Sequence, residues 1–380
     1  MKVLDALRGS SRLPRSGLLA LWVVACVPPL AALAPATPPH EAAPPTGLIR
    51  TGDRVAWIGS SSTKIGVWPR TMEFLLRTRH PDLDLQFRSF TTGGGTFTTG
   101  LEHLDAWLDE FRPTVVFFNY GGNDAAAGQE GLARFKDVLE QCVEKARARG
   151  ARVALITPQT ADPRRSGVLA AARRTLYAET MLAHGRGRGW TVLDIHHPLE
   201  AMQKANQRRD PAYTILRDTI HLTDPAYVAW GFVLYDRLDL PFVRSAATLT
   251  ADGEVTATEN CAIRDVEPGP GTLAFTRRDA VLPILPPGPL PPRFSVPLEA
   301  HSRYVLAITD LESGEYEIRC EGRPIGTVSA GILAAGVNLN SLLLDGDREA
   351  PWAATAQAAW DGRMPGDVGR TAWRFEIRRR

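Results

Sequence analysis

The sequence predicts an α/β fold in which a parallel sheet lies between two layers of helices and is followed by a smaller β-rich accessory domain. The first observation behind this prediction is that short apolar runs alternate with longer amphipathic stretches over residues 51–243. The second is a change of pattern near Pro241, after which short alternating runs are separated by turn sequences such as Asp-Gly and Gly-Pro-Gly. A chain of 380 residues is long enough for both domains.

Five apolar runs have the length of strands and alternate with helical stretches, which is typical of a parallel, doubly wound sheet. The third run contains Val-Val-Phe-Phe and indicates a strand that is buried on both faces. We expect the flavodoxin-like strand order, in which a ligand site lies outside the carboxyl ends of the strands. The predicted strands are residues 55–58, 83–90, 114–119, 153–157 and 190–195, and the predicted helices are residues 70–79, 101–111, 130–149, 167–184 and 226–238.

Residues 244–380 are interpreted as the β-rich accessory domain, because short runs that alternate with a period of two follow one another between hairpin signals. Their number of residues is ordinary for one domain. Residues 286–292 form a stiff, polyproline-like connector, and residues 329–343 and 350–360 have partly helical patterns. The predicted strands are residues 247–255, 262–266, 273–277, 304–308, 316–321, 323–328 and 371–377.

Residues 1–36 have the order of a secretory signal peptide, in which basic residues precede the short apolar run 17–25. Two processing outcomes compete. Residues 23–26, Val-Val-Ala-Cys, resemble the lipobox of bacterial lipoproteins, in which Cys26 is lipidated and tethers the protein to a membrane; alternatively, the small residues at 34–36 form a cleavage site. Residues 37–50 form a Pro/Ala-rich linker. The sequence therefore predicts an exported protein that is periplasmic, membrane-tethered or secreted.

Charge and cysteine content narrow the classes of partner. The formal net charge of +2, without a basic stripe interleaved with aromatic residues, gives no reason to expect nucleic acid. Cys142 lies in a helical pattern as a predicted core residue. Cys261 and Cys320 both lie in strand-like sequence and are able to pair in an oxidising compartment, a pairing that the sequence leaves open. No spacing of histidines and cysteines suggests a zinc site.

Small and polar residues follow three of the predicted strands at the point where each strand ends. Gly59 is followed by three serines and a threonine, which supply hydroxyl groups before the next helix. Residues 91–96, Thr-Thr-Gly-Gly-Gly-Thr, let a backbone N–H approach a ligand, and residues 120–124, Tyr-Gly-Gly-Asn-Asp, add a side-chain amide. Each stretch taken alone is ordinary turn or N-cap sequence.

Asp218 and His221 lie three residues apart, ahead of the last predicted helix. At this spacing the carboxylate accepts the imidazole N–H, which fixes the tautomer and leaves the other nitrogen free as a base. We favour His221 over His196 and His197 because we take it alone to have an aspartate at the spacing that fixes the ring. A lone Asp-x-x-His is as often a surface ion pair. Together with the hydroxyls, glycines and amide, however, it completes the set of nucleophile, oxyanion hole and oriented base.

Over residues 53–238 the sequence resembles the SGNH (GDSL-type) hydrolase superfamily. Residues 59–61, Gly-Ser-Ser, stand where the family has Gly-Asp-Ser, and residues 121–124, Gly-Gly-Asn-Asp, match its Gly-x-Asn-Asp block. Gly94 falls on the glycine of the second block, and Asp218 with His221 on the Asp-x-x-His of the fifth. The layout, including the β-rich C-terminal region, resembles that of exported members from planctomycete-type bacteria.

The resemblance implies an exported serine esterase that hydrolyses carboxylic esters, in the first place acetyl esters on glycans or small molecules, without a metal or organic cofactor. Two alternatives stay open: an O-acyltransferase that uses the same triad, and an inactive protein that binds carbohydrate or the cell envelope. The implied site residues are the catalytic triad Ser61, His221 and Asp218 and the oxyanion-hole donors Ser61, Gly94 and Asn123.

Overall fold

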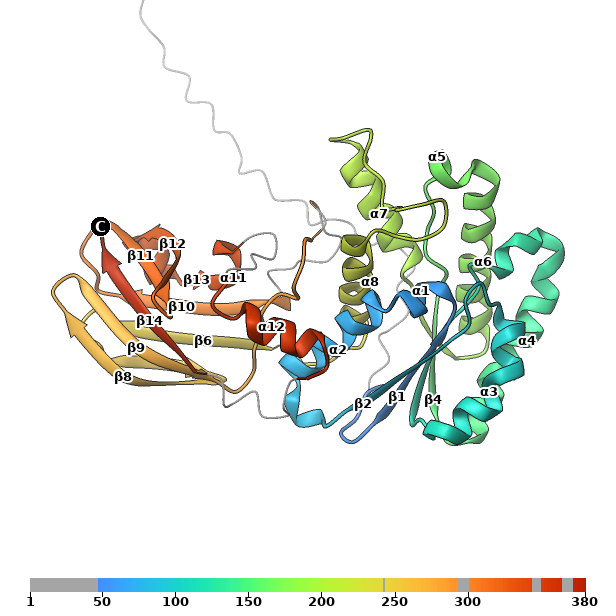
Figure 1. Ribbon diagram of the computed structural model, residues 1–380, viewed down its shortest axis with the longest axis horizontal. Coiled ribbons are helices and arrows are strands. Elements are labelled where there is room, and N and C mark those ends of the chain that lie inside the picture. The colour runs from blue at the N-terminus through green and yellow to red at the C-terminus, as the bar shows by residue number, and fades with distance from the viewer. Residues whose placement is uncertain (1–46, 242, 291, 293–300, 344–349, 364–371) are drawn as a thin grey trace, which may run out of the picture. The chain divides into compact units, whose positions relative to one another are not determined.

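The structure is a computed structural model that describes residues 47–241, 243–290, 292, 301–343, 350–363 and 372–380 (Figure 1). The predicted signal peptide, Cys26 with its lipobox and most of the predicted linker lie outside the described residues. Within the described part of the chain, no helix is both long enough and apolar enough to cross a membrane.

A five-stranded parallel sheet has the order β2-β1-β3-β4-β5, which confirms the flavodoxin-like prediction. The second strand begins at Gln86 rather than at residue 83, because Pro81–Leu83 form a 3-10 turn and Asp84 has a left-handed φ of 49°. The strands are β1 (Arg54–Gly59), β2 (Gln86–Thr91), β3 (Val115–Asn119), β4 (Arg152–Ile156) and β5 (Thr191–Leu193).

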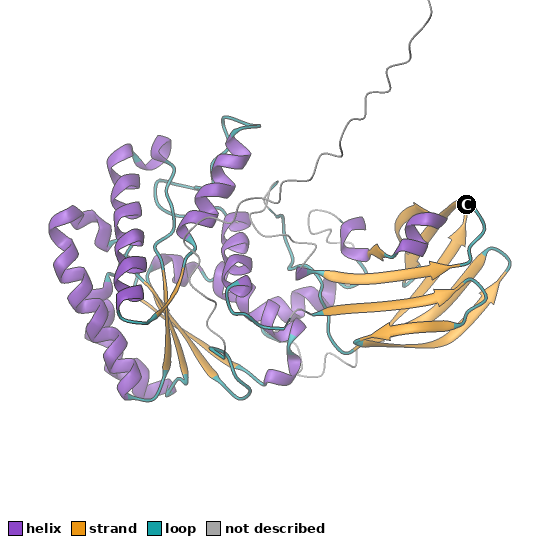
Figure 2. Cartoon of the chain, turned by 180° about the vertical axis from the view of Figure 1, so that it is seen from behind, coloured by secondary structure: helices purple, strands orange, loops and turns teal. Residues whose placement is uncertain are grey.

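Helices cover both faces of this sheet and complete a three-layer sandwich (Figure 2). Successive residues of β1 divide between the two layers, as the period of two along a strand requires. Val55 and Trp57 pack with one set of helices, and Ala56 and Ile58 with the other. The first set is α2 (Val67–Arg79), α7 (His196–Gln207) and α8 (Asp224–Asp236), and the second is α3 (Phe97–Phe111), α4 (Leu132–Ala148) and α6 (Val168–Gly187).

Three helices of this part are absent from the prediction: α7 and the short helices α1 (Ser61–Ile65) and α5 (Pro163–Ser166). In α7 only Leu199 and Met202 are large apolar residues on the buried face, too few to give the pattern of a helix. The proline near its start is tolerated because the first turn needs no backbone donor there.

Among its described residues, the C-terminal part contains two further sheets. One has the order β13-β10-β6-β7 with β6 and β10 parallel, and the other, β12-β11-β14-β9-β8, is antiparallel throughout. The single strand predicted at residues 247–255 is wrong, because Asp252 and Gly253 form the turn between β6 and β7, with φ of 93° at Gly253. The strands are β6 (Arg244–Thr250), β7 (Val255–Glu259), β8 (Cys261–Gly269), β9 (Thr272–Asp279), β10 (Arg303–Thr309), β11 (Glu315–Cys320), β12 (Arg323–Ser329), β13 (Val337–Asn338) and β14 (Ala372–Arg379).

The partly helical stretches of the C-terminal part are confirmed as three short helices: α10 (Ala330–Ala335), α11 (Leu339–Leu342) and α12 (Ala353–Trp360). The disulfide left open by the sequence is not formed, and Cys261 and Cys320 are free thiols. Cys261 lies on β8 and Cys320 on β11, and the two strands β14 and β9 separate them in the sheet. Neighbouring strands are about 4.8 Å apart, so the two cysteines lie well beyond the reach of a disulfide.

The end of α2 is bonded to the C-terminal part through buried polar groups. The guanidinium of Arg79 donates to the carbonyl oxygens of His301 at 2.9 Å and Ile284 at 3.0 Å, and the N–H of Leu282 donates to the carbonyl of Thr78 at 2.7 Å. Burial lowers the pKa of Arg79 to about 10. The apolar core also continues from α2 into the C-terminal strands.

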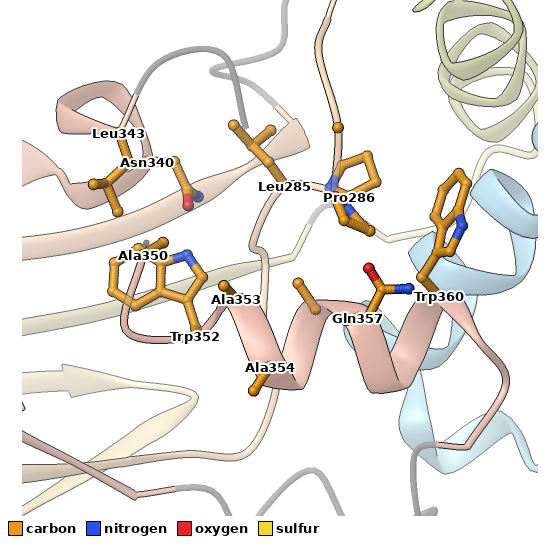
Figure 3. Close-up of a pocket in the computed structure, with 13 residues that line it drawn as sticks. Leu285, Pro286, Asn340, Leu343, Ala350, Trp352, Ala353, Ala354, Gln357 and Trp360 are labelled. Atoms are coloured by element: carbon orange, nitrogen blue, oxygen red, sulfur yellow. The ribbon is translucent and has the colours of Figure 1, made fainter. Parts of the chain in front are cut away.

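A cavity of about 490 Å³ lies beside α12 (Figure 3). In Figure 3, Gln357 and Trp360 project from α12 toward Pro286. Asn340 also lines this cavity, but its amide donates to the carbonyl oxygens of Pro283 and Ser302 and so holds the surrounding loops together. None of the site residues implied by the sequence lines this cavity.

Candidate active site

The carboxyl ends of β1, β2 and β3 are bonded to one another beside the serines. The N–H of Thr92 donates to the carbonyl of Gly59 at 3.0 Å, and the N–H of Ser60 donates to that of Asn119 at 3.3 Å. A Cβ atom at Gly59 would lie 2.2 Å from Thr63 Oγ1 and 2.8 Å from the carbonyl oxygen of Asn119. Glycine is therefore required at the end of β1 because the chain turns back tightly against its own next helix.

The three adjacent serines have different environments. Ser60 is the N-cap of α1, with extended φ and ψ of −90° and −153°, but its side chain makes no capping hydrogen bond. Ser61 is the first residue of α1, where a backbone N–H has no partner within the helix. Ser62 is buried, and its hydroxyl donates to Gln159 Oε1 at 3.4 Å. Only the hydroxyl of Ser61 is hydrogen-bonded to His221.

Ser61, His221 and Asp218 form one hydrogen-bonded chain. His221 Nδ1 lies 2.9 Å from Asp218 Oδ2, and His221 Nε2 lies 3.0 Å from Ser61 Oγ. Because an ionised carboxylate can only accept, Nδ1 carries the proton and Nε2 is left to accept the hydroxyl hydrogen of Ser61. This tautomer is the one in which a serine hydroxyl is bonded to a free basic nitrogen.

The Asp218 carboxylate is held by the backbone of its own loop. Partial burial acts to raise its pKa, but the N–H groups of His221 and Ile220, each 2.7 Å from Oδ1, and the imidazole of His221 outweigh it and lower the pKa of Asp218 to about 2. The carboxylate therefore stays ionised through the neutral and mildly acidic range. The negatively charged carboxylate of Asp218 therefore holds the imidazole ring of His221 in one orientation throughout this pH range.

The loop that carries Asp218 and His221 is tied down at several points. Leu216 pairs with Leu222 in an isolated antiparallel bridge, so the segment between them forms a narrow loop. Gln159 Nε2 donates to the carbonyl of Ile220 at 3.3 Å, while its Oε1 accepts from Ser62. Gln159 thus connects the helix of Ser61 to the loop of His221. Gln159 is not predictable from the sequence, because a single glutamine after β4 carries no pattern of its own.

The loops after β2 and β3 lie together. Asn123 Nδ2 donates to the carbonyl of Gly95 at 2.8 Å, which fixes the amide and leaves its second N–H hydrogen for another acceptor. Gly94 has a left-handed φ of 70°, and within the described part of the chain no heavy atom beyond its two neighbours lies within 4 Å of the place where a Cβ would be. The loop therefore leaves open space beside the backbone of Gly94.

Asp124, the residue after Asn123, is hydrogen-bonded to the backbone of other segments and does not cap the helix that follows it. An aspartate at the start of a helical segment often accepts backbone N–H groups of the first turn of that segment. Instead, Oδ1 accepts from the N–H of Phe97, at the start of α3, at 3.1 Å, and Oδ2 accepts from the N–H of Gly121 at 2.9 Å. Burial raises the pKa of Asp124, and its hydrogen bonds with backbone N–H groups, these two included, only partly offset that rise. Asp124 joins the loop after β3 to the preceding helix and leaves Asn123 as the amide of this loop.

The expectation that His221 alone has an aspartate three residues before it is wrong. Asp194 lies three residues before His197, at the same spacing, and His197 Nδ1 is 2.7 Å from Asp194 Oδ2. What separates the two histidines is the second nitrogen: His197 Nε2 is 2.9 Å from Glu179 Oε1, whereas that of His221 meets a serine hydroxyl. The hydrogen bond to Asp194 is the main cause that raises the pKa of His197 to about 9, which marks it as half of an ion pair.

His196 is buried, with Nδ1 3.1 Å from the carbonyl of Pro158 and Nε2 3.1 Å from Thr175 Oγ1. Burial lowers its pKa. Both nitrogens are thus used to hold the chain after β4. Across the described residues, no group of three or more His, Cys, Asp or Glu side chains is arranged to hold a metal ion.

Several solved structures align with this chain. A gut microbial diltiazem-metabolizing enzyme aligns at a TM-score of 0.69 with 19% identity, over 82% of this chain and 76% of that one. An acetylxylan esterase from Geobacillus stearothermophilus aligns at a TM-score of 0.43 with 15% identity, over 52% of this chain and 98% of its own. The lipase/acylhydrolase from Enterococcus faecalis aligns at 0.40 with 18% identity, over 49% and 95%. At these identities the similarity concerns the fold.

No curated protein sequence matches the chain. The profile of the GDSL-like lipase/acylhydrolase family matches residues 55–229, which include Ser61, Gly94, Asn123, Asp218 and His221. The matched stretch begins in β1 and ends within α8, so it covers the parallel sheet and its helices. Residues 55–229 are therefore a GDSL-like domain of the SGNH superfamily, and the protein is an ester hydrolase of that type.

Proposed function

We propose that Ser61, His221 and Asp218 are the catalytic triad of a serine esterase that acts on carboxylic esters, in the first place acetyl esters. The observation that carries the proposal is the hydrogen-bonded chain from Asp218 through His221 to Ser61, with distances of 2.9 and 3.0 Å. His221 takes the hydroxyl proton while Ser61 attacks the ester carbonyl, and then gives that proton to the leaving alcohol. Water, deprotonated by the same nitrogen, releases the acid from the acyl-enzyme.

The oxyanion hole in this proposal consists of the N–H groups of Ser61 and Gly94 and the side-chain amide of Asn123. Support comes from three features already described: the N-terminal position of Ser61 in α1, the open space at Gly94, and the amide hydrogen of Asn123 that is not used by Gly95. Preorganised donors of this kind stabilise the negative charge that develops on the carbonyl oxygen.

Glycans are the alcohol component that we propose to test first. The support is the predicted export of the protein and its resemblance to exported superfamily members. Both arguments concern the place where the enzyme meets its substrate. The bond that is cleaved is a carboxylic ester in either case. A transferase would use the same three residues and differ only in the acceptor that resolves the acyl-enzyme.

Acetate release by the purified protein tests this function. Acetylated glycans and short-chain aryl acetates are offered in parallel, with the Ser61→Ala variant as the blank. We expect acetate release that depends on Ser61, and no acetylated product when free sugar is added. Transfer of the acetyl group to the added sugar in preference to water would identify a transferase, and equal rates with the blank would refute the esterase proposal.

Replacing Asn123 by alanine is expected to lower kcat by roughly a hundredfold or more, the usual loss for one oxyanion donor. KM is expected to change little, because the donor acts mainly on the transition state. Asn123→Asp is expected to be at least as damaging, because a carboxylate repels the developing charge and cannot donate to Gly95. Kinetics on an aryl acetate, with thermal unfolding as the check on folding, measure both variants. Near-normal kcat in Asn123→Asp would show that the residue only holds the loop.

A further inference from the structure

Apolar side chains are exposed beside the proposed active site. Among the described residues, the large apolar side chains that are exposed are Val168 at 76%, Leu169 at 64%, Ile332 at 50%, Ile220 at 41% and Val255 at 39%. Val168 and Leu169 are the first two residues of α6, and Ile220 directly precedes His221. The other two lie in the C-terminal part, on α10 and β7.

The segment that carries Val168 and Leu169 and the one that carries Ile220 are far apart in the sequence and are tied together by the fold. Ser166 Oγ donates to the carbonyl of Thr219 at 2.7 Å, which ties the segment before Val168 to the residue before Ile220. Gly167, with φ of 86°, separates α5 from α6 and so sets the direction in which α6 starts. Figure 1 shows α5 and the start of α6 beyond the carboxyl ends of the strands, where α1 also begins.

The buried core does not explain why these three positions carry apolar side chains. The buried face of α6 is made by Arg174, Tyr177, Ala178, Met181 and Gly185, so Val168 and Leu169 contribute nothing to the core from that helix. The main chain of Ile220 is held by Gln159, and its side chain remains exposed. An exposed apolar cluster beside a reactive group is a common mark of a ligand-binding surface.

We propose that Val168, Leu169 and Ile220 form an apolar rim that binds the alcohol portion of the ester, so that the preferred substrates carry an apolar group next to the ester oxygen. This inference rests on the proposed function above. His221 must protonate the leaving oxygen, so the alcohol lies on the His221 side of Ser61, where Ile220 is the next residue and consecutive Cα atoms are about 3.8 Å apart. The carbonyl oxygen of the ester points instead toward Gly94 and Asn123.

The size of the rim favours a substrate group over a protein partner. A stable protein interface buries about 800 Å² on each side, which three side chains do not supply. One alkyl or ring group of a small molecule is large enough to cover the surface of three side chains. Each methylene group that leaves water on such a surface strengthens binding by about twofold to fourfold.

Acetate esters of straight-chain alcohols, from methanol to hexan-1-ol, test the rim when used below their solubility limits. We expect kcat/KM of the wild type to rise by about twofold per methylene group or more. In the triple variant Val168→Ser/Leu169→Ser/Ile220→Ser this slope is expected to flatten, with a loss of about tenfold or more on hexyl acetate that shrinks toward methyl acetate. Val255→Ser and Ile332→Ser are the matched controls, because they remove exposed apolar side chains elsewhere and should keep the wild-type slope.

Several results would overturn the rim. An unchanged slope in the triple variant would do so, as would the same flattening in the Val255→Ser control. Methyl esters of longer acids form a second series. If only this series shows a slope that the triple variant flattens, the rim binds the acyl chain instead of the alcohol. Rim-dependent activation confined to ester emulsions would identify a surface for lipid-like aggregates. If the wild type hydrolyses neither these esters nor acetylated glycans faster than Ser61→Ala, the proposed function fails and the rim with it. If it hydrolyses acetylated glycans or methyl acetate but shows no slope along this series, only the rim fails.

Discussion

Replacing Ser61 by alanine is expected to abolish ester hydrolysis, with a loss of kcat of roughly a millionfold, as is typical when the nucleophile of a triad is removed. The reason is geometric: Ser61 Oγ is 3.0 Å from His221 Nε2, and neither neighbouring hydroxyl is bonded to that nitrogen. Initial rates on an aryl acetate, with circular dichroism to check folding, measure the effect. An inactive Ser60→Ala beside an active Ser61→Ala would shift the proposed nucleophile by one residue.

The adjacent serines are the matched controls for this experiment. Ser60→Ala is expected to keep most of the activity, because its side chain makes no capping hydrogen bond to lose. Ser62→Ala loses the contact to Gln159 at 3.4 Å and with it one link to the His221 loop, so a moderate decrease is expected while turnover remains measurable.

Replacing His221 by alanine is expected to lower kcat by a similar factor, because the same step loses its base. Asp218→Ala is expected to cost clearly less, about ten-thousandfold, because the imidazole keeps part of its orientation through Ser61. His197→Ala is the control that matters most. It removes a histidine with the same spacing to an aspartate, but one bonded to Glu179 at 2.9 Å instead of a serine.

Kinetics of the three variants on one ester, with thermal unfolding of each, separate catalysis from stability. His197→Ala is expected to lose an ion pair with Asp194 and to keep its turnover in the fraction that is folded. An active His221→Ala together with a folded but inactive His197→Ala would refute the proposed triad. Equal losses in His221→Ala and His197→Ala, with folding intact, would contradict it as well.

Local patterns along the sequence were enough to determine the central fold. Five apolar runs that alternate with amphipathic stretches specify parallel strands covered by helices, because a strand buried on both faces needs a helical layer on each. The same alternation puts the residues after each strand at one edge of the sheet, so Gly59, the glycines of residues 93–95 and Asn123 were expected to be neighbours. They are connected in the structure by the hydrogen bonds between the strand ends and from Asn123 to Gly95.

Contacts between distant residues were decided by the tertiary structure alone. Ser61 and His221 are 160 positions apart, and no local pattern states which of two Asp-x-x-His spacings has its free nitrogen beside a serine. Gln159, which connects their loops, and the cysteines, which the strand order of a sheet keeps apart, illustrate the same limit. Periodicity fixes which face of an element is buried; the partner on that face depends on how the whole chain packs, and a short stretch of sequence does not contain that information.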